Sequence, residues 1–246
     1  MTELRAAAPA AAAAYDPDCA RCPRLAAFLE RTRKQHPDYW ARPVPSFGAR
    51  RPLLVIVGLA PGMHGANRTG RPFTGDHAGI LLYQTLYEAG LATAPVSQSA
   101  DDRLRLLNAR IVNSVKCVPP QNKPLPDEVR CCNGYLAEEL RQLRRARVYL
   151  ALGRVAHDAV LMALGLARTR YPFAHGREHA LDPLDRLGGL DRLDGTRCLI
   201  DSYHCSRYNT ATGRLTAAMF QAVVARACER AGLARPRRGQ GCRGMG

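Results

Sequence analysis

The residues best suited to chemistry lie in one glycine-rich loop, residues 58–79, which reads GLAPGMHGANRTGRPFTGDHAG. It follows an apolar run at residues 52–57 that is typical of a buried parallel strand, and it precedes a segment of helical spacing. Ligands of open α/β sheets bind at the carboxyl ends of strands, where glycines let the backbone approach a substrate. Asp76 in this loop could orient a water molecule. A long solvated connection is the alternative, but long loops in compact domains are usually functional.

Cysteines form a second group with the residue types of a binding site. Cys19 and Cys22 make a CxxC pair, Cys117 follows the second predicted strand, and Cys131 and Cys132 fall in the next predicted helix. Two ligands from the pair, one from the strand end and one from the helix could complete a four-thiolate site. Zinc and a [4Fe–4S] cluster both accept four thiolates, so spacing alone does not distinguish them.

The composition indicates the kind of partner. The chain has 36 Lys and Arg against 21 Asp and Glu, a formal net charge of +15, which favours a polyanion such as nucleic acid. No apolar run is long enough to span a bilayer, and the N-terminus lacks the apolar core of a signal peptide. We therefore expect a cytoplasmic protein without a membrane partner. In that compartment its nine cysteines favour metal binding over disulfides.

Apolar runs alternate with segments of helical spacing, which predicts a parallel sheet with helices on both faces. The expected strands are residues 53–57, 109–115, 148–152 and 197–200. The expected helices are residues 24–34, 79–89, 127–144, 155–164 and 216–231. Residues 168–196 have no clear period and are expected to form a long excursion. One domain should cover residues 15–232, between a disordered alanine-rich segment at residues 1–14 and a basic disordered tail at residues 233–246.

Four segments resemble motifs of the iron–sulfur uracil-DNA glycosylases, most closely the family 5 enzymes of bacteria and archaea. They are GLAPG at residues 58–62 continuing through GANRTGRPFTGD at residues 65–76, NSVKCVPPQNKP at residues 113–124, ALG at residues 151–153, and YHCSRYNTATGRLT at residues 203–216. The first and last motifs are long and specific. The resemblance covers roughly residues 15–232.

The resemblance implies a three-layer α/β/α fold with a central four-stranded parallel sheet, and a [4Fe–4S] cluster beside the active site. It assigns the cluster ligands to Cys19, Cys22, Cys117 and Cys132. Cys132 is preferred to Cys131 because it better matches the family's spacing from the Lys-Cys motif, although the cysteine doublet keeps both in consideration.

The resemblance also implies a reaction. A DNA glycosylase flips its base out of the duplex and hydrolyses the N-glycosidic bond, which leaves an abasic site and starts base excision repair. Phe73 would lie under the uracil ring, and the amide of Asn113 could read the O4 and N3–H edge. His204 would donate to uracil O2 as negative charge develops there. Asp76 would orient the attacking water, and it could also cap the helix that follows.

The first motif further indicates the shape of the pocket. Gly58 and Ala60 are expected to line it. Other branches of the superfamily have an acidic or amide residue where this chain has Leu59 and Ala60, and neither of these can activate water. Asn67 and His64 are lesser candidates for that task. Two apolar residues leave a roomier pocket, in keeping with the family's tolerance of damaged bases, so the resemblance implies hypoxanthine and ethenocytosine as substrates besides uracil.

The last motif would hold the DNA. Ser206, Arg207 and Asn209, together with Arg68, are expected to contact the backbone around the flipped nucleotide, while the net charge supplies sequence-independent affinity. Cys205 stands where the family usually has proline, so the turn should be less rigid but keep its donor. The expected partner is duplex DNA that contains uracil or deaminated bases, with single-stranded DNA as a further substrate. The protein is therefore expected to be a monomer that associates with the nucleoid through DNA.

Two other functions also fit part of the sequence. A zinc-stabilised, non-catalytic nucleic-acid-binding module would explain the charge and the cysteines, but not the loop that carries Phe73 and Asp76. An α/β enzyme that processes nucleotides or phosphate esters could use the glycine loop as an anion cradle. That enzyme would require a divalent metal ion, whereas glycosylase chemistry requires none.

Overall fold

The structure is a computed structural model that describes residues 14–181 and 197–233. The disordered segments predicted at residues 1–14 and 233–246 lie outside the described residues apart from one residue of each. The same holds for residues 182–196 of the predicted excursion.

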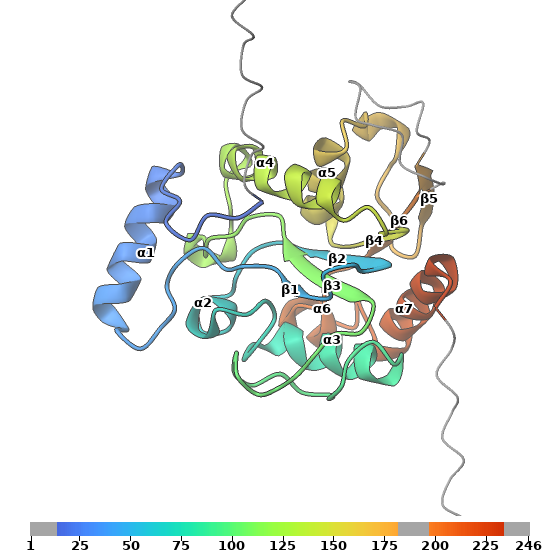
Figure 1. Cartoon of the computed structure of the whole chain (residues 1–246), viewed down its shortest axis with the longest axis horizontal. Coiled ribbons are helices and arrows are strands. Elements are labelled where there is room, and N and C mark those ends of the chain that lie inside the picture. Colours follow the sequence, from blue (N-terminus) through green and yellow to red (C-terminus); the bar gives the residue numbers. More distant parts are fainter. Residues whose placement is uncertain (1–13, 182–196, 234–246) are drawn as a thin grey trace, which may run out of the picture.

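The described chain contains one six-stranded sheet in the order β1-β3-β2-β4-β6-β5 (Figure 1). Its four central strands are parallel, as predicted: β3 (Ala109–Asn113), β2 (Leu54–Gly58), β4 (Val148–Leu152) and β6 (Arg197–Ser202). Two antiparallel edge strands that the sequence did not reveal complete it: β1 (Phe47–Gly48) and β5 (Glu178–Leu181). The predicted central sheet is therefore confirmed, and it is wider than expected.

The central strands are buried on both faces, which explains their continuous apolar sequences. Along β2, Val55 and Val57 belong to the core on one side of the sheet, whereas Leu54 and Ile56 belong to the core on the other. All four side chains are fully buried. Burial on both faces requires a layer of helices on each side, the arrangement typical of parallel sheets.

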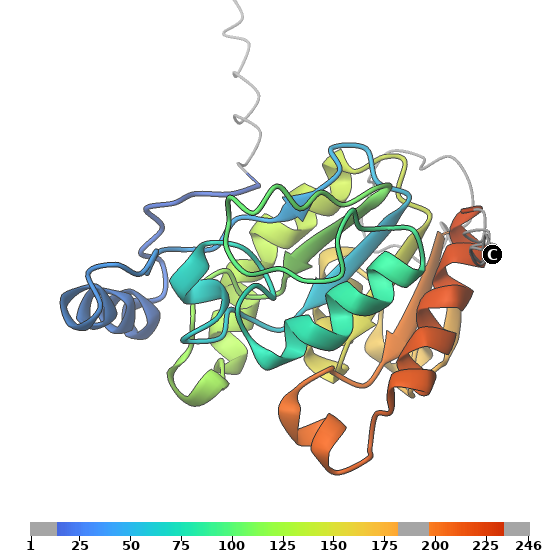
Figure 2. The ribbon, with the colours of Figure 1, turned by 90° about the horizontal axis from the view of Figure 1, so that it is seen from below.

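All five predicted helices are present. Helices α4 (Pro126–Gln142) and α5 (Arg154–Ala163) cover one face, and α3 (His77–Glu88) and α7 (Ala217–Ala231) cover the other (Figure 1). Helix α1 (Pro23–Gln35) projects from the body of the domain and buries Leu25 and Leu29 in the core beneath α4 (Figures 1 and 2). The fold is thus the expected three-layer α/β/α arrangement.

Shorter elements were not predicted, because a single turn carries too little periodicity. They are α2 (Ala66–Thr69), α6 (Arg207–Ala211) and two 3-10 turns at Pro120–Asn122 and Arg168–Arg170. Strand β5 lies within the segment expected to be an aperiodic excursion, and it is an edge strand of only four residues. In the described part of the chain, no helix combines the length and the apolar character that crossing a membrane requires.

The carboxyl ends of the four parallel strands lie at one edge of the sheet. Gly58 of β2 pairs with Asn113 of β3, and Leu152 of β4 pairs with Ser202 of β6. The loops that follow these strands carry all four sequence motifs. The fold therefore brings the motifs together at the edge where ligands of such sheets bind.

Candidate active site

The backbone of Gly58 and the side chains of Asn113 and Phe73 converge at the end of β2. A Cβ atom at Gly58 would lie 2.5 Å from Oδ1 of Asn113 and 2.7 Å from the Phe73 ring, closer than atoms can approach. Only glycine therefore lets Asn113 and Phe73 meet across this strand. Both side chains are buried, yet Oδ1 of Asn113 has no hydrogen-bond partner among the described residues. Leaving a buried acceptor unpaired costs folding free energy, and this atom can accept a hydrogen bond from an N–H group of a ligand.

Phe73 has an unusual backbone. Its φ is +55°, in the left-handed region that non-glycine residues rarely occupy. Its carbonyl oxygen would lie 1.8 Å from a Cβ atom at Gly79, so the first turn of α3 must have glycine there. Tyr83 of α3 donates a hydrogen bond of 2.7 Å to the carbonyl oxygen of Pro72. Helix α3 therefore fixes the direction of the Phe73 side chain.

His204 follows β6 and lies near Phe73. The two ring centroids are 6.0 Å apart with 29° between the planes, and the amide of Asn209 donates to the His204 carbonyl oxygen at 2.8 Å. Burial lowers the pKa of His204 to about 4. The imidazole is therefore neutral near pH 7, and a neutral imidazole offers one N–H donor and one acceptor.

Asp76 is the N-cap of α3. Its Oδ1 accepts a hydrogen bond of 2.9 Å from the Gly79 amide. Its Oδ2 lies against the backbone of the first motif, 2.6 Å from where a Cβ atom of Gly65 would stand and 3.3 Å from that of Gly62. Burial raises the pKa of the carboxyl group, although the amide donors oppose this. The capping role predicted as an alternative is present in the structure, and it leaves the second oxygen for another partner.

The other first-motif residues lie around this group. Ala60 is half-buried and packs on the core between the sheet and α4. Asn67 is fully buried in α2, where its Oδ1 has no partner among the described residues. His64 is exposed, and its Nδ1 lies 2.8 Å from the Tyr39 hydroxyl. His64 is therefore engaged with Tyr39 at the surface.

The residues expected to hold DNA divide into two kinds. The Ser206 hydroxyl caps α6 by accepting a hydrogen bond of 3.5 Å from the backbone N–H of Asn209. With the bond from the Asn209 side chain to His204, these two side chains shape the turn after His204. Arg207 and Arg68 are exposed, and Nε of Arg68 donates to the His64 carbonyl oxygen at 2.8 Å. The structure also reveals Tyr208, whose ring is 71% exposed beside this turn. The sequence could have indicated it only as an aromatic residue within a polar motif.

A surface hollow opens beside Asp76. Its lining residues are Arg68, Gly75, Asp76, His77, Gly79, Ile80, Gln84, Pro95, Val96, Ser97 and Gln98. Residues 95–98 come from the connection between α3 and β3, whose sequence carries no motif that predicts a role. Exposed Ile80 and Val96 give the hollow apolar walls next to the capping carboxylate.

The predicted ligand cysteines meet at the amino end of α1. Cys19, Cys22, Cys117, Cys131 and Cys132 all line one small pocket. Among the described residues, His157, His179 and Asp201 form the one group of three potential ligands close enough to bind a single metal ion, and no cysteine belongs to it. The five thiols therefore line a common pocket without forming a compact single-ion site.

The two neighbouring cysteines differ in their contacts. The Cys132 sulfur accepts a hydrogen bond of 3.3 Å from the Lys116 amide, whereas the Cys131 sulfur donates toward the Arg21 carbonyl oxygen at 3.9 Å. Burial raises the pKa of Cys22 to about 12 and also raises that of Cys117. An accepting sulfur has the contact of a thiolate ligand, and this favours Cys132.

A cluster of buried polar side chains surrounds Asp201, three residues before His204. Asp201 of β6 accepts from Nδ1 of His157 at 2.7 Å, from Nε2 of His179 at 3.1 Å and from the Ala174 amide at 3.2 Å. Nε2 of His157 lies 2.8 Å from the Tyr171 carbonyl oxygen. Both ring nitrogens of His157 thus face oxygen atoms of the protein. These contacts fix residues 171–179 to β6, three residues before His204.

Comparison with known proteins extends these observations. Residues 45–228 match the Uracil DNA glycosylase superfamily. The chain is 47% identical over 220 residues to the type-5 uracil-DNA glycosylase of Thermus thermophilus, covering 87% of this chain and 94% of that protein. It is 42% identical over 223 residues to the type-5 enzyme of Mycobacterium bovis, with 87% and 79% covered. It is 40% identical over 219 residues to that of Pyrobaculum aerophilum, with 87% and 90% covered.

Proposed function

From the premise that this chain belongs to the uracil DNA glycosylase superfamily and is a type-5 uracil-DNA glycosylase, we propose how its residues excise uracil and which further bases it removes. The enzyme acts on DNA that contains uracil, in base excision repair. The non-catalytic zinc module considered from the sequence is therefore excluded as its main function.

The unpaired Oδ1 of Asn113 carries the proposal. It lies beside the Phe73 ring at the end of β2, where a flipped base can stack on the ring and present its edge to the amide. Uracil offers an N3–H donor next to the O4 acceptor, which complements one amide oxygen and one amide nitrogen. Such a base supplies the hydrogen bond that the buried acceptor lacks.

The same edge supports hypoxanthine as a second substrate. Its N1–H and O6 present a donor beside an acceptor, as uracil does, so Asn113 can pair with either base. Ethenocytosine lacks that N–H donor, and its removal would depend on space beside Ala60 and Leu59 and on stacking with Phe73. We therefore expect excision in the order uracil, hypoxanthine, ethenocytosine.

His204 and Asp76 divide the chemistry of bond breaking. As the C1′–N1 bond breaks, negative charge moves to uracil O2, and an N–H from the neutral His204 ring stabilises it. Positive charge develops on the sugar, where the Asp76 carboxylate stabilises it and accepts a hydrogen bond from the attacking water. The Oδ2 atom of Asp76 is suited to this because Oδ1 already caps α3. Product formation then requires the water proton to leave through that carboxylate.

DNA is held mainly by charge. The net charge of +15 and the exposed Arg68 and Arg207 suit contacts to phosphates on either side of the flipped nucleotide. Ser206 and Asn209 contribute through the turn that they shape and through the backbone amides at the start of α6. Duplex DNA is the main substrate, and a single strand can present its base to the same pocket.

We further propose that Cys19, Cys22, Cys117 and Cys132 hold a [4Fe–4S] cluster. Four thiols that line one pocket without forming a compact single-ion site are a donor set that fits such a cluster. When bound, the cluster would act as a cross-link between the start of α1, the loop after β3 and α4. Cys131 would remain a neighbouring thiol.

Release of free base from three matched duplexes tests this function. Each duplex carries uracil, hypoxanthine or ethenocytosine at the same position, and an unmodified duplex is the control. We expect uracil to be released fastest, hypoxanthine more slowly and nothing from the control. Removal of ethenocytosine as fast as uracil would contradict the assignment of Asn113 as the group that reads the base.

A further inference from the structure

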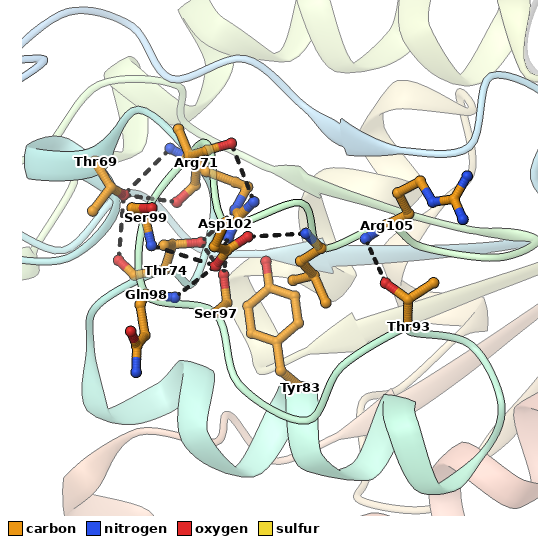
Figure 3. A network of polar contacts seen from close by, with 12 residues as sticks. Thr69, Arg71, Thr74, Tyr83, Thr93, Ser97, Gln98, Ser99, Asp102 and Arg105 are labelled. Carbon is orange, nitrogen blue, oxygen red and sulfur yellow. Dashed lines mark hydrogen bonds and ion pairs between the residues drawn. The ribbon is translucent and has the colours of Figure 1, made fainter.

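Arg71 of the first motif has a buried side chain that is committed to the protein itself. Its side chain is 4% exposed. Nε donates to Oγ1 of Thr74 at 2.9 Å, and Nη2 donates at 2.6 Å both to Oγ of Ser97 and to Oδ2 of Asp102. Nη1 donates to the Ala100 carbonyl oxygen at 3.3 Å. Figure 3 shows this network, with Arg71 beside Asp102.

These contacts exclude the role that an arginine in a glycine-rich loop first suggests. A phosphate-binding arginine presents its nitrogens to the ligand, but each nitrogen of Arg71 donates to a protein acceptor. The face of the guanidinium also lies 4.8 Å from the centre of the Phe47 ring. Arg71 therefore acts on the protein rather than on DNA.

Asp102 joins Arg71 to the connection between α3 and β3. Its carboxylate accepts from the backbone amides of Gln98 at 2.9 Å and Leu104 at 3.0 Å, in addition to Arg71. The side chain of Asp102 is 20% exposed, so the ion pair is largely shielded from water. Such a pair is sensitive to loss of either partner, because the other is left as an uncompensated charge.

The segment that Arg71 and Thr74 enclose is the one that carries the stacking residue. Phe73 lies between them with its φ of +55°, a conformation that costs about 1 kcal/mol or more and must be held by its surroundings. The network also extends past Phe73, since the Gly75 amide donates to the Ser97 carbonyl oxygen at 3.3 Å. Asp76 is the next residue. One hydrogen-bond network thus holds the backbone on both sides of Phe73 and up to Asp76.

We propose that Arg71 and Asp102 form a positioning pair for uracil excision: the connection at residues 97–102 holds the first motif so that Phe73 and Asp76 keep their places in the pocket. The inference rests on the proposed function and deepens it. A displacement of about 1 Å at reacting groups can cost on the order of 10²-fold in rate. The pair therefore affects catalysis without touching the substrate.

The test uses Arg71→Lys, which keeps the charge but removes the planar fork, and Asp102→Asn, which keeps the shape. We expect single-turnover excision at saturating enzyme to fall roughly 10- to 100-fold in both. The double variant should be no slower than the slower single variant, because the two residues act as one unit. Ser97→Ala, a milder change in the same network, should lower the rate by a smaller factor. Asp101→Asn, a neighbouring exposed carboxylate, is the matched control.

A second measurement separates positioning from mere stability. A duplex with one 2′-fluorinated deoxyuridine binds without being cleaved, because the fluorine disfavours positive charge on the sugar. We expect the preference for this duplex over an unmodified one to fall roughly tenfold in the pair variants, with affinity for the unmodified duplex unchanged.

Three results would overturn the inference. The first is a single-turnover rate of the pair variants equal to that of Asp101→Asn. The second is a rate loss that matches the unfolded fraction by circular dichroism while the preference for the fluorinated duplex stays intact, and the third is a rate loss in the double variant equal to the product of the two single losses. A wild-type protein that releases no uracil would instead contradict the proposed function.

Discussion

The Asp76 carboxylate caps α3 with one oxygen and has the second oxygen against the glycines of the first motif. We predict that Asp76→Asn slows single-turnover excision by at least about 10²-fold, because the charge that orients water and stabilises the sugar is lost. The asparagine can still cap the helix. Burial raises the pKa of Asp76, so at pH values above that pKa the ionised carboxylate lowers the stability of the folded protein. The melting temperature should therefore stay equal or rise.

Comparing rate and thermal unfolding in the same preparation decides between the two roles. Near wild-type excision by Asp76→Asn would leave Asp76 as a cap alone, with the water held elsewhere, for example by Asn67. Early melting with full activity in the folded fraction would likewise mean that the capping bond is its main contribution.

His204 gives a prediction about pH. Its pKa of about 4 keeps the ring neutral across the working range, so its protonation cannot limit the rate near its usual pKa of about 6.5. The role proposed for Asp76 requires its ionised form, and because burial raises its pKa, we expect activity to be lost in acid above the usual carboxyl value of about 3.9. Single-turnover rates should be flat from about pH 8 to 6.5 and fall only in acid. A midpoint near 6.5 that disappears in His204→Ala would contradict this assignment.

The neutral donor itself can be removed. His204→Ala should lower the single-turnover rate by about 10² to 10³, the usual effect of losing one donor to a developing anion. Affinity for an undamaged duplex should not change, since charge dominates that binding. A rate within a few fold of wild type would mean that another group faces uracil O2.

The cysteine doublet can be resolved with two variants. Cys132→Ser should reduce bound iron from about four atoms per chain toward none after anaerobic purification, and Cys131→Ser should leave it unchanged. Iron and acid-labile sulfide are the quantities to measure. Stoichiometric zinc without iron would contradict the cluster, and the reverse pattern in the two variants would move the fourth ligand to Cys131.

At the scale of elements, the sequence predicted what is long and periodic. The four parallel strands and five long helices were found because each has either a continuous apolar run or a helical period. The edge strands β1 and β5 were missed, since two and four residues carry no such signal. Likewise, the role of residues 97–102 depends on contacts far along the chain, such as Arg71 with Asp102, and no local pattern encodes them.

The candidate site was predictable to a similar extent. The positions of Phe73, Asp76, Asn113 and His204 followed from motifs at strand ends, and the structure brings these elements to one edge of the sheet. Their roles remain proposals. The cap at Asp76, the left-handed backbone of Phe73 and the unpaired oxygen of Asn113 depend on three-dimensional packing. Only the structure could reveal them.

The attachment of β5 and residues 171–179 to β6 depends on Asp201. Leaving a buried hydrogen-bond donor without an acceptor usually costs about 1 to 3 kcal/mol. We predict that Asp201→Asn lowers the free energy of unfolding by about 2 kcal/mol, because the asparagine amide has one acceptor oxygen instead of two and leaves a buried donor of this cluster unpaired. Denaturant titration measures this. Asp158→Asn is the control, since that carboxylate pairs with a largely exposed Arg168 and should cost less than about 1 kcal/mol. Equal losses would contradict the network.

For the molecule as a whole, we predict that charge dominates the binding of DNA. With a net charge of +15, affinity for undamaged duplex should fall roughly tenfold or more between about 50 and 200 mM salt. Deletion of residues 235–246 removes four arginines and should weaken this non-specific binding more than it slows single-turnover excision. Fluorescence anisotropy across a salt series measures the first effect. A flat salt dependence would mean that phosphates contribute little.

We predict that this protein hydrolyses the glycosidic bond of uracil in DNA with its own side chains and without a divalent metal ion. The most direct test is a duplex with a single uracil, incubated with the purified protein in excess EDTA and then assayed for abasic sites and free uracil. We expect one abasic site and one free uracil per substrate molecule, at the rate seen with added magnesium. No release of uracil in EDTA, with release restored by magnesium, would contradict it.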